Sequence, residues 1–203
     1  MPGIPTAYIE ASYRGHKATP GKYKLTLEVN GKALETEAVI LANPLYPTTP
    51  QEYVEYDRVM SDMEKLLTQM HSKTNRLFRI QNRIKELLKS IPDEKGYAKV
   101  REQGNMLAET LRKWDEELVQ RKSKAYDDVE NFPNKFTAEY LFLINQTESD
   151  IPRVTNASKE RRKELEAQWK KLEAQANKLI QKDLPAYNKL LWEKKIGAIW
   201  MTK

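Results

Sequence analysis

The chain has 203 residues, of which 32% are charged and 39% are hydrophobic, and it contains 7 glycines. This composition is typical of amphipathic helices with one solvated face, and the length allows one or two domains. The 35 basic and 29 acidic residues give a net charge of +6, but both signs are mixed along the helical part, which disfavours nucleic-acid binding. The absence of cysteine excludes disulfides, thiolate nucleophiles and cysteine-ligated metals, and no apolar run reaches the ~18 residues of a membrane span.

The β signal of the sequence lies in residues 1–43. Between Lys22 and Val29 apolar and polar residues alternate strictly, as in a half-buried strand. Asn30-Gly31 follows directly and favours a two-residue type I′ turn, which predicts a returning strand through Leu34 to Ile40. A hairpin is marginally stable alone, so we expect it to pack on the strand-like stretch 7–11, on the helices, or on strands of a larger sandwich. A strand so close to residue 1 also suggests a fragment of a longer protein.

A proline-containing linker at residues 43–48 separates this β unit, residues 1–43, from a helical bundle, residues 49–203. Thr49 and Glu52 form a capping-box pattern that predicts the start of the first helix. Beyond it, apolar residues recur at steps of three and four and are interrupted only at Thr74 and Gln81: Tyr56, Met60, Met63, Leu67, Met70, Leu77, Ile84, Leu88 and Ile91. A flanking apolar row widens this seam beyond that of a two-stranded coiled coil, which predicts one inward face of a bundle.

The rest of the chain reads as further helices. Pro92 and Gly96 end the first helix, and the short break predicts an antiparallel second helix that continues towards Val129. A short apolar helix follows residues 131–134, and a last long helix is expected to begin with Asn156 as its cap and to stop at 183–185. The predicted fold is mainly α with a small β unit: an N-terminal β-hairpin or partial sandwich followed by an antiparallel bundle of long helices.

The common signatures of catalysis are missing from the sequence. It has no glycine-rich phosphate loop, no G-x-S-x-G elbow and no H-E-x-x-H helix. The two histidines, His16 and His71, are interpreted as a surface residue and a helix-flank residue. Three close acid pairs are expected to form ion pairs on solvated helix faces rather than to flank a cleft: Asp115 with Glu116, Asp127 with Asp128, and Glu164 with Glu166. We therefore predict no catalytic residue, no cofactor and no metal.

An apolar tail follows the last helix and is the candidate interaction surface. It contains Ile196, Ile199 and Trp200, and Trp192 lies just before it. The alternative, which we favour, is that these side chains fold back over the bundle or the hairpin. The densest basic face, residues 161–171, is interleaved with glutamates and leaves open a further alternative, a basic helical protein that binds anionic polymers.

Two stretches of the chain resemble a known family. Arg14-Gly15 followed by Ala18–Tyr23 and the alternating residues up to Lys32 is similar to a hairpin of bacterial sortilin-like β-propeller proteins, the BNR-repeat proteins labelled glycosyl hydrolases. The segment Asp183–Leu191 resembles the end of the same proteins, and Asn131–Pro133 resembles a turn of their helical part. In that family these elements follow the propeller. This chain lacks short strands at blade spacing and Asp-box-like repeats, so the resemblance gives no catalytic residue.

The resemblance implies a non-catalytic C-terminal accessory domain of a larger periplasmic or extracellular protein. Its expected partner is its own propeller domain or another protein, and a homodimer is a further option. The alternative function is part of a glycoside hydrolase that acts on glycans, with the helical part contributing to a cleft.

Overall fold

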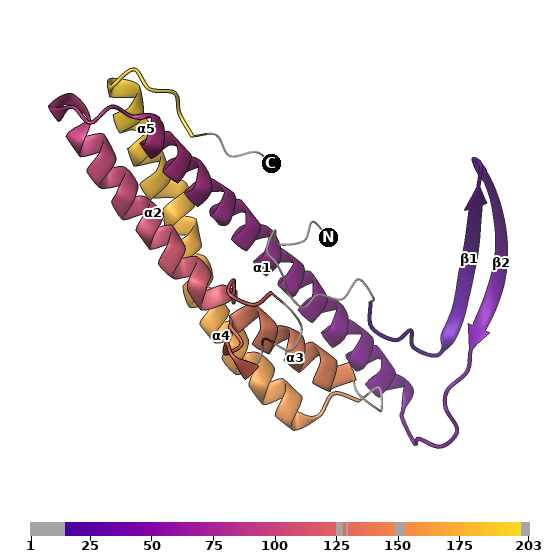
Figure 1. Cartoon of the computed structure of the whole chain (residues 1–203). Coiled ribbons are helices and arrows are strands. Elements are labelled where there is room, and N and C mark those ends of the chain that lie inside the picture. Colours follow the sequence, from indigo (N-terminus) through magenta and orange to yellow (C-terminus); the bar gives the residue numbers. More distant parts are fainter. Residues whose placement is uncertain (1–14, 125–127, 129, 149–152, 200–203) are drawn as a thin grey trace.

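The computed structural model describes residues 15–124, 128, 130–148 and 153–199 (Figure 1). A two-stranded hairpin is followed by an elongated bundle of helices, which confirms the predicted fold class. The strands are β1 (Gly21–Val29) and β2 (Lys32–Ile40). The helical elements are α1 (Pro50–Ser90), η1 (Lys95–Tyr97), α2 (Ala98–Leu118), α3 (Phe136–Glu148), α4 (Asn156–Lys178), η3 (Leu179–Asp183) and α5 (Leu184–Glu193).

The hairpin forms as the sequence predicts. Asn30 and Gly31 have φ angles of 51° and 75°, the left-handed values that a type I′ turn requires. The register pairs Leu27 with Leu34 and Val29 with Lys32, so apolar side chains of both strands share one face. The stretch 7–11, which was expected to support the hairpin, lies outside the described residues.

α1 begins at the predicted capping box. The Thr49 hydroxyl accepts the Glu52 backbone N–H, and the Glu52 carboxylate accepts the Thr49 backbone N–H at 2.8 Å. The predicted seam faces the core throughout, with Leu88 half-buried and the other apolar members buried. Thr74 and Gln81 are buried as well, because each side chain finds an acceptor: the Met70 carbonyl at 2.8 Å and the Ala108 carbonyl at 3.4 Å.

α2 packs antiparallel to α1, as predicted, but it ends at Leu118 instead of continuing towards Val129 (Figure 1). Val129 itself lies outside the described residues. Two contacts account for the early end. Thr137 donates its hydroxyl to the Leu118 carbonyl at 2.9 Å, and Arg121 turns back to bind the buried Asp115. The Arg121 guanidinium also lies 3.7 Å from the centre of the Phe78 ring, which fixes the departing chain on α1.

The last helix differs from its prediction at both ends. Its cap is Thr155, whose hydroxyl accepts the Ser158 backbone N–H at 3.1 Å, so Asn156 is the first helical residue rather than the cap. The helix also does not stop at 183–185. It passes through the π-helical turn η3 into α5, with Pro185 in the first turn of α5. Because a π turn widens the backbone, it accommodates a ring that would clash in a regular α-helix.

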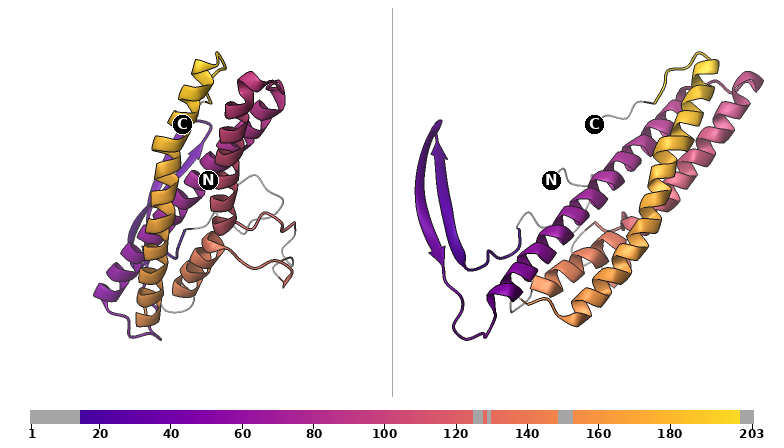
Figure 2. Two further views of the ribbon diagram at one scale, coloured as in Figure 1. Left: turned by 90° about the vertical axis from the view of Figure 1, so that its left-hand side faces the viewer. Right: turned by 180° about the vertical axis from the view of Figure 1, so that it is seen from behind.

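The core lies within the bundle. Helices, their connections and the tail residue Ile199 supply the members of the cluster of buried apolar residues, and the hairpin supplies none among the described residues. Seen from behind, the hairpin stands beside the bundle and is joined to it at its base (Figure 2). Within the described part of the chain, no helix has the combination of length and apolar character that crossing a membrane needs.

Candidate interaction surface

One face of the hairpin carries mostly apolar side chains, although Thr36 and Lys32 of β2 also lie on it. The period of two in the sequence and the register of the strands place them together. We call this set the hairpin face: Tyr23, Leu25, Leu27, Val29, Leu34, Ala38 and Ile40. Leu27 and Leu34 lie opposite each other at its centre and are 61% and 69% exposed. Only Tyr23 and Ala38 are even half-buried. A surface of this kind on a monomer marks a site that something else covers.

The opposite face of the hairpin is mainly polar, although Val39, which is 59% exposed, and Ala33 also lie on it. It presents Lys22, Lys24 and Glu28 on β1, and Glu35 and Glu37 on β2. Lys24 and Glu35 form an exposed ion pair with a distance of 2.7 Å between nitrogen and oxygen. One side of the hairpin is thus suited to water and the other to an apolar surface.

The segment before β1 is attached to α1 through His16, whose side chain is only 12% exposed. Its backbone N–H donates to Glu64 at 2.7 Å, and its ring nitrogens lie 3.2 Å from Glu64 Oε2 and 3.1 Å from Asp57 Oδ1. Burial by itself lowers the pKa of His16, but the hydrogen bonds and charges of Asp57 and Glu64 outweigh it and raise the pKa above 6.5. This contact could not be predicted from a local pattern, because its partners lie 41 and 48 residues away in the chain.

His71 has a different environment. It is buried against the bundle, and this burial lowers the pKa of its imidazole. Across the described ranges, no group of three or more histidines, aspartates and glutamates is arranged to hold a metal ion.

The predicted tail surface divides into parts with different environments. Trp192 is 78% exposed, whereas Ile199 is buried and Ile196 is half-buried against the core. The Asn188 side chain holds the tail down: it donates to the Ile199 carbonyl at 3.2 Å and accepts the Ile199 N–H at 2.9 Å. Trp200 lies outside the described residues. The two isoleucines therefore fold back, and Trp192 alone of the three described candidates points to solvent.

The acid pairs named from the sequence do not converge where the structure describes them. Asp115 is buried with Arg121, whereas Glu116 pairs with Arg112 at 2.5 Å on the exposed face of the same helix. Glu164 and Glu166 pair separately with Arg161 at 3.0 Å and Arg162 at 2.6 Å. Asp127 lies outside the described residues. The pairs of Glu116, Glu164 and Glu166 are the local ion pairs that the sequence predicted for the helices, whereas Asp115 is buried and binds an arginine beyond the end of α2.

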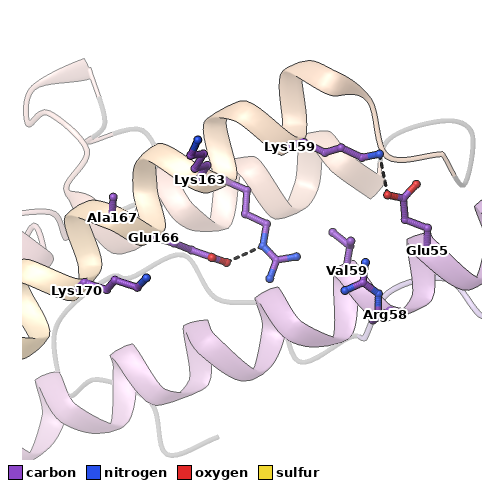
Figure 3. Close-up of a pocket in the computed structure, with 9 residues that line it drawn as sticks. Glu55, Arg58, Val59, Lys159, Lys163, Glu166, Ala167 and Lys170 are labelled. Atoms are coloured by element: carbon purple, nitrogen blue, oxygen red, sulfur yellow. Dashed lines mark hydrogen bonds and ion pairs between the residues drawn. The ribbon is translucent and has the colours of Figure 1, made fainter.

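A groove of about 430 Å³ lies between α1 and α4 (Figure 3). Its lining is mainly basic: Glu55, Arg58, Val59, Lys159, Arg162, Lys163, Glu166, Ala167 and Lys170. Lys159 pairs with Glu55 at 2.7 Å, and Arg162 pairs with Glu166. The other three cations, Arg58, Lys163 and Lys170, form no salt bridge with a carboxylate among the described residues. The groove therefore has an excess of positive charge.

Comparisons with known proteins do not place the chain in a family: no family model, no curated protein and no solved structure matches it.

Proposed function

We propose that this chain is a non-catalytic interaction module of a larger, exported β-propeller protein, in which the hairpin face packs on a β-sheet next to the propeller. The observation that carries the proposal is the contrast between a bundle whose apolar faces are buried and a hairpin face that is exposed. The likeness of residues 14–32 and 183–191 to the C-terminal region of sortilin-like proteins supports this choice of parent.

The apolar surface of the hairpin face contributes to docking. Five of its side chains are large and at least 39% exposed: Leu25, Leu27, Val29, Leu34 and Ile40. Full burial of an aliphatic side chain contributes about 1.5–3 kcal/mol, so covering these partly exposed groups contributes roughly 1 kcal/mol each. That sum, about 5 kcal/mol, is close to the lowest cost of bringing two free molecules together, about 4 kcal/mol, so the hairpin face docks best on a partner to which the chain is already linked.

The geometry of the hairpin face favours a sheet as its occupant. Strands of nine residues extend about 30 Å, and an apolar face with a period of two packs on another sheet about 10 Å away. The helices bury most of their apolar residues against one another, and the apolar residues that they expose in the described part of the chain, such as Phe142 and Met106, stand on different helices. We therefore assign the occupant as strands of the parent polypeptide, with which the hairpin forms a sandwich.

Co-expression with the propeller-containing part of the parent tests this assignment. The wild-type chain should co-purify with that part, and Leu25→Lys with Leu27→Lys should abolish co-purification because both lysines enter the covered face. Thr26→Lys with Ala33→Lys adds the same charge to the opposite face and should have little effect. Equal retention of the two double variants would contradict docking through the hairpin face. A parental reading frame without propeller repeats would contradict the parentage.

A second candidate function, binding of an anionic polymer, is favoured by the groove between α1 and α4. Its three cations without a salt bridge could bind phosphate, sulfate or carboxylate groups in succession. Retention on immobilised heparin that falls steeply with salt would support it, provided that Lys163→Ala with Lys170→Ala elutes much earlier. Lys99→Ala with Lys189→Ala, which removes the same charge from exposed positions elsewhere, is the control. If both double variants elute at the same salt concentration, heparin retention depends only on net charge and the groove is not the binding site.

The glycoside hydrolase alternative requires two carboxylates facing each other about 5–9.5 Å apart across a cleft. The acids that the sequence offered are engaged by arginines: Asp115 by Arg121, Glu164 by Arg161 and Glu166 by Arg162. Turnover of any member of a glycoside panel by the chain would favour this alternative over the proposed module.

A further inference from the structure

We infer that His16 is a pH-dependent latch: in its protonated form it holds the base of the hairpin on α1 and so fixes the direction in which the hairpin face is presented. This inference concerns the regulation of the proposed docking surface and rests on that function only for its biological use. The latch itself is a property of the described residues and can be tested without a partner.

The latch is built from two carboxylates on one face of α1. Asp57 and Glu64 are seven residues apart, which places both on the same side of the helix about 10 Å apart along its axis. The His16 ring lies between them, with one nitrogen 3.1 Å from Asp57 and the other 3.2 Å from Glu64. The ring also meets the Tyr56 ring edge to face, with centroids 5.7 Å apart.

This geometry satisfies both carboxylates in one protonation state. A protonated imidazole has two N–H donors, one for each carboxylate. A neutral imidazole has one donor, so its other nitrogen would place a lone pair against a carboxylate oxygen. Deprotonation therefore replaces one charge-assisted hydrogen bond with a repulsive contact and weakens the other.

The position of His16 makes this contact important for the hairpin. The hairpin is joined to α1 in two places: through residues 41–49 after β2, and through residues 15–20 before β1. In the second segment, the Lys17 backbone N–H also donates to Glu148 of α3 at 2.9 Å. Neither strand packs extensively on a helix among the described residues. If the His16 ring is released, residues 41–49, the Lys17 hydrogen bond and the hydrogen bond from the His16 backbone N–H to Glu64 remain. We expect the hairpin to sample more directions once the two contacts of the ring are lost.

The carboxylates around His16 all favour its protonated form. Asp57 and Glu64 of α1 contact the imidazole directly, and Glu148 of α3 lies nearby through Lys17. Tyr56 stays neutral over the relevant range, because burial above all raises its pKa to about 12. The pKa of His16 is raised, so its stabilising contribution is complete below the ordinary value of 6.5 and is lost as pH rises through the higher value of the folded protein.

Pulsed electron–electron distance measurements test the latch in the whole chain. Because the sequence has no cysteine, Lys32→Cys at the hairpin turn and Lys85→Cys on α1 can carry two spin labels without other changes. We expect a narrow distance distribution below pH 6.5 that broadens as His16 loses its proton, with a midpoint equal to the pKa of His16 measured by NMR. The buried His71, whose pKa is lowered, titrates separately and serves as the internal reference.

Three variants distinguish a latch from a general effect of pH. His16→Gln should give a broad distribution at every pH, with an unchanged helical circular dichroism spectrum. Asp57→Asn and Glu64→Gln should each shift the midpoint to lower pH, because each removes one charge that favours the protonated ring. A distribution that stays the same while NMR shows His16 to titrate would overturn the latch, and so would a midpoint at or below 6.5. If the latch responds but co-purification with the propeller fails, the proposed function is wrong and the latch is not.

Discussion

The bundle and the hairpin are built from the same kind of sequence signal, yet they have opposite environments. Along α1 the apolar residues at steps of three and four are buried, as Leu77 is at 1% exposure. Along β1 and β2 the apolar residues at steps of two are exposed, and Leu27 on the hairpin face is 61% exposed. The comparison teaches that an amphipathic pattern identifies a face that needs cover but not the group that covers it. In the bundle, the apolar faces are covered by other helices of the same chain.

The largest difference in stability is expected between leucine-to-alanine variants of the two regions. Leu77→Ala removes buried methyl groups from the core and should lower the free energy of unfolding by about 2–5 kcal/mol. Leu27→Ala makes the same chemical change on the hairpin face and should change it by less than about 0.5 kcal/mol. Chemical denaturation followed by circular dichroism measures both values. A large effect of Leu27→Ala would mean that the hairpin face is already covered in the isolated chain.

A pair of glycines gives a smaller contrast within the helical part. A Cβ at Gly104 of α2 would lie 2.9 Å from Leu88 Cδ2 and 3.0 Å from Tyr187 Cζ, so Gly104→Ala should destabilise the bundle by about 1–3 kcal/mol. Gly96→Ala is the matched control, since a Cβ there meets no atom within 4 Å. Thermal unfolding measures the stability of the two variants, and Gly104→Ala should have the lower melting temperature. Equal melting temperatures would contradict the close approach of α1, α2 and α5.

The smallest effect on the bundle is expected from the hairpin turn. Gly31 has a φ of 75°, so Gly31→Ala places a side chain in a left-handed conformation that costs about 1–2 kcal/mol. We expect faster amide hydrogen exchange along β1 and β2, with no change in the exchange of buried helical amides. Coupled changes in both regions would show that they unfold together.

The sequence predicted the elements that depend on neighbouring residues. The Asn30-Gly31 turn, the capping box at Thr49 and the seam of α1 are confirmed, because each is decided within a few turns of chain. The predicted end of α2 was wrong, because the helix ends where Leu118 accepts a hydrogen bond from Thr137, 19 residues later in the chain. The cap of α4 was wrong by one residue, as Thr155 competes with Asn156 for the same role.

The continuation of the last helix could have been recognised. Its fully buried apolar positions advance by three and four up to Leu179 and then by five to Leu184, which is the spacing of one π turn, although the half-buried Ile180 lies four residues before Leu184. We interpreted Pro185 as a stop instead. The candidate site was less accessible to such reasoning. Exposure of the hairpin face and the contacts of His16 depend on which distant segments meet, and no short motif encodes that.

The π turn has a consequence for where the molecule can touch other molecules. Because the helix passes through η3 without reversing, α5 runs on to the start of α2, where the Tyr187 hydroxyl donates to the Val100 carbonyl at 3.3 Å. α5, which contains Trp192, consequently lies at the end of α1 that is distant from the base of the hairpin (Figure 1). α1 alone measures about 60 Å at 1.5 Å per residue. Two ligands bound at these opposite ends would be held apart by the continuous helix α1. A single small ligand could not contact both ends.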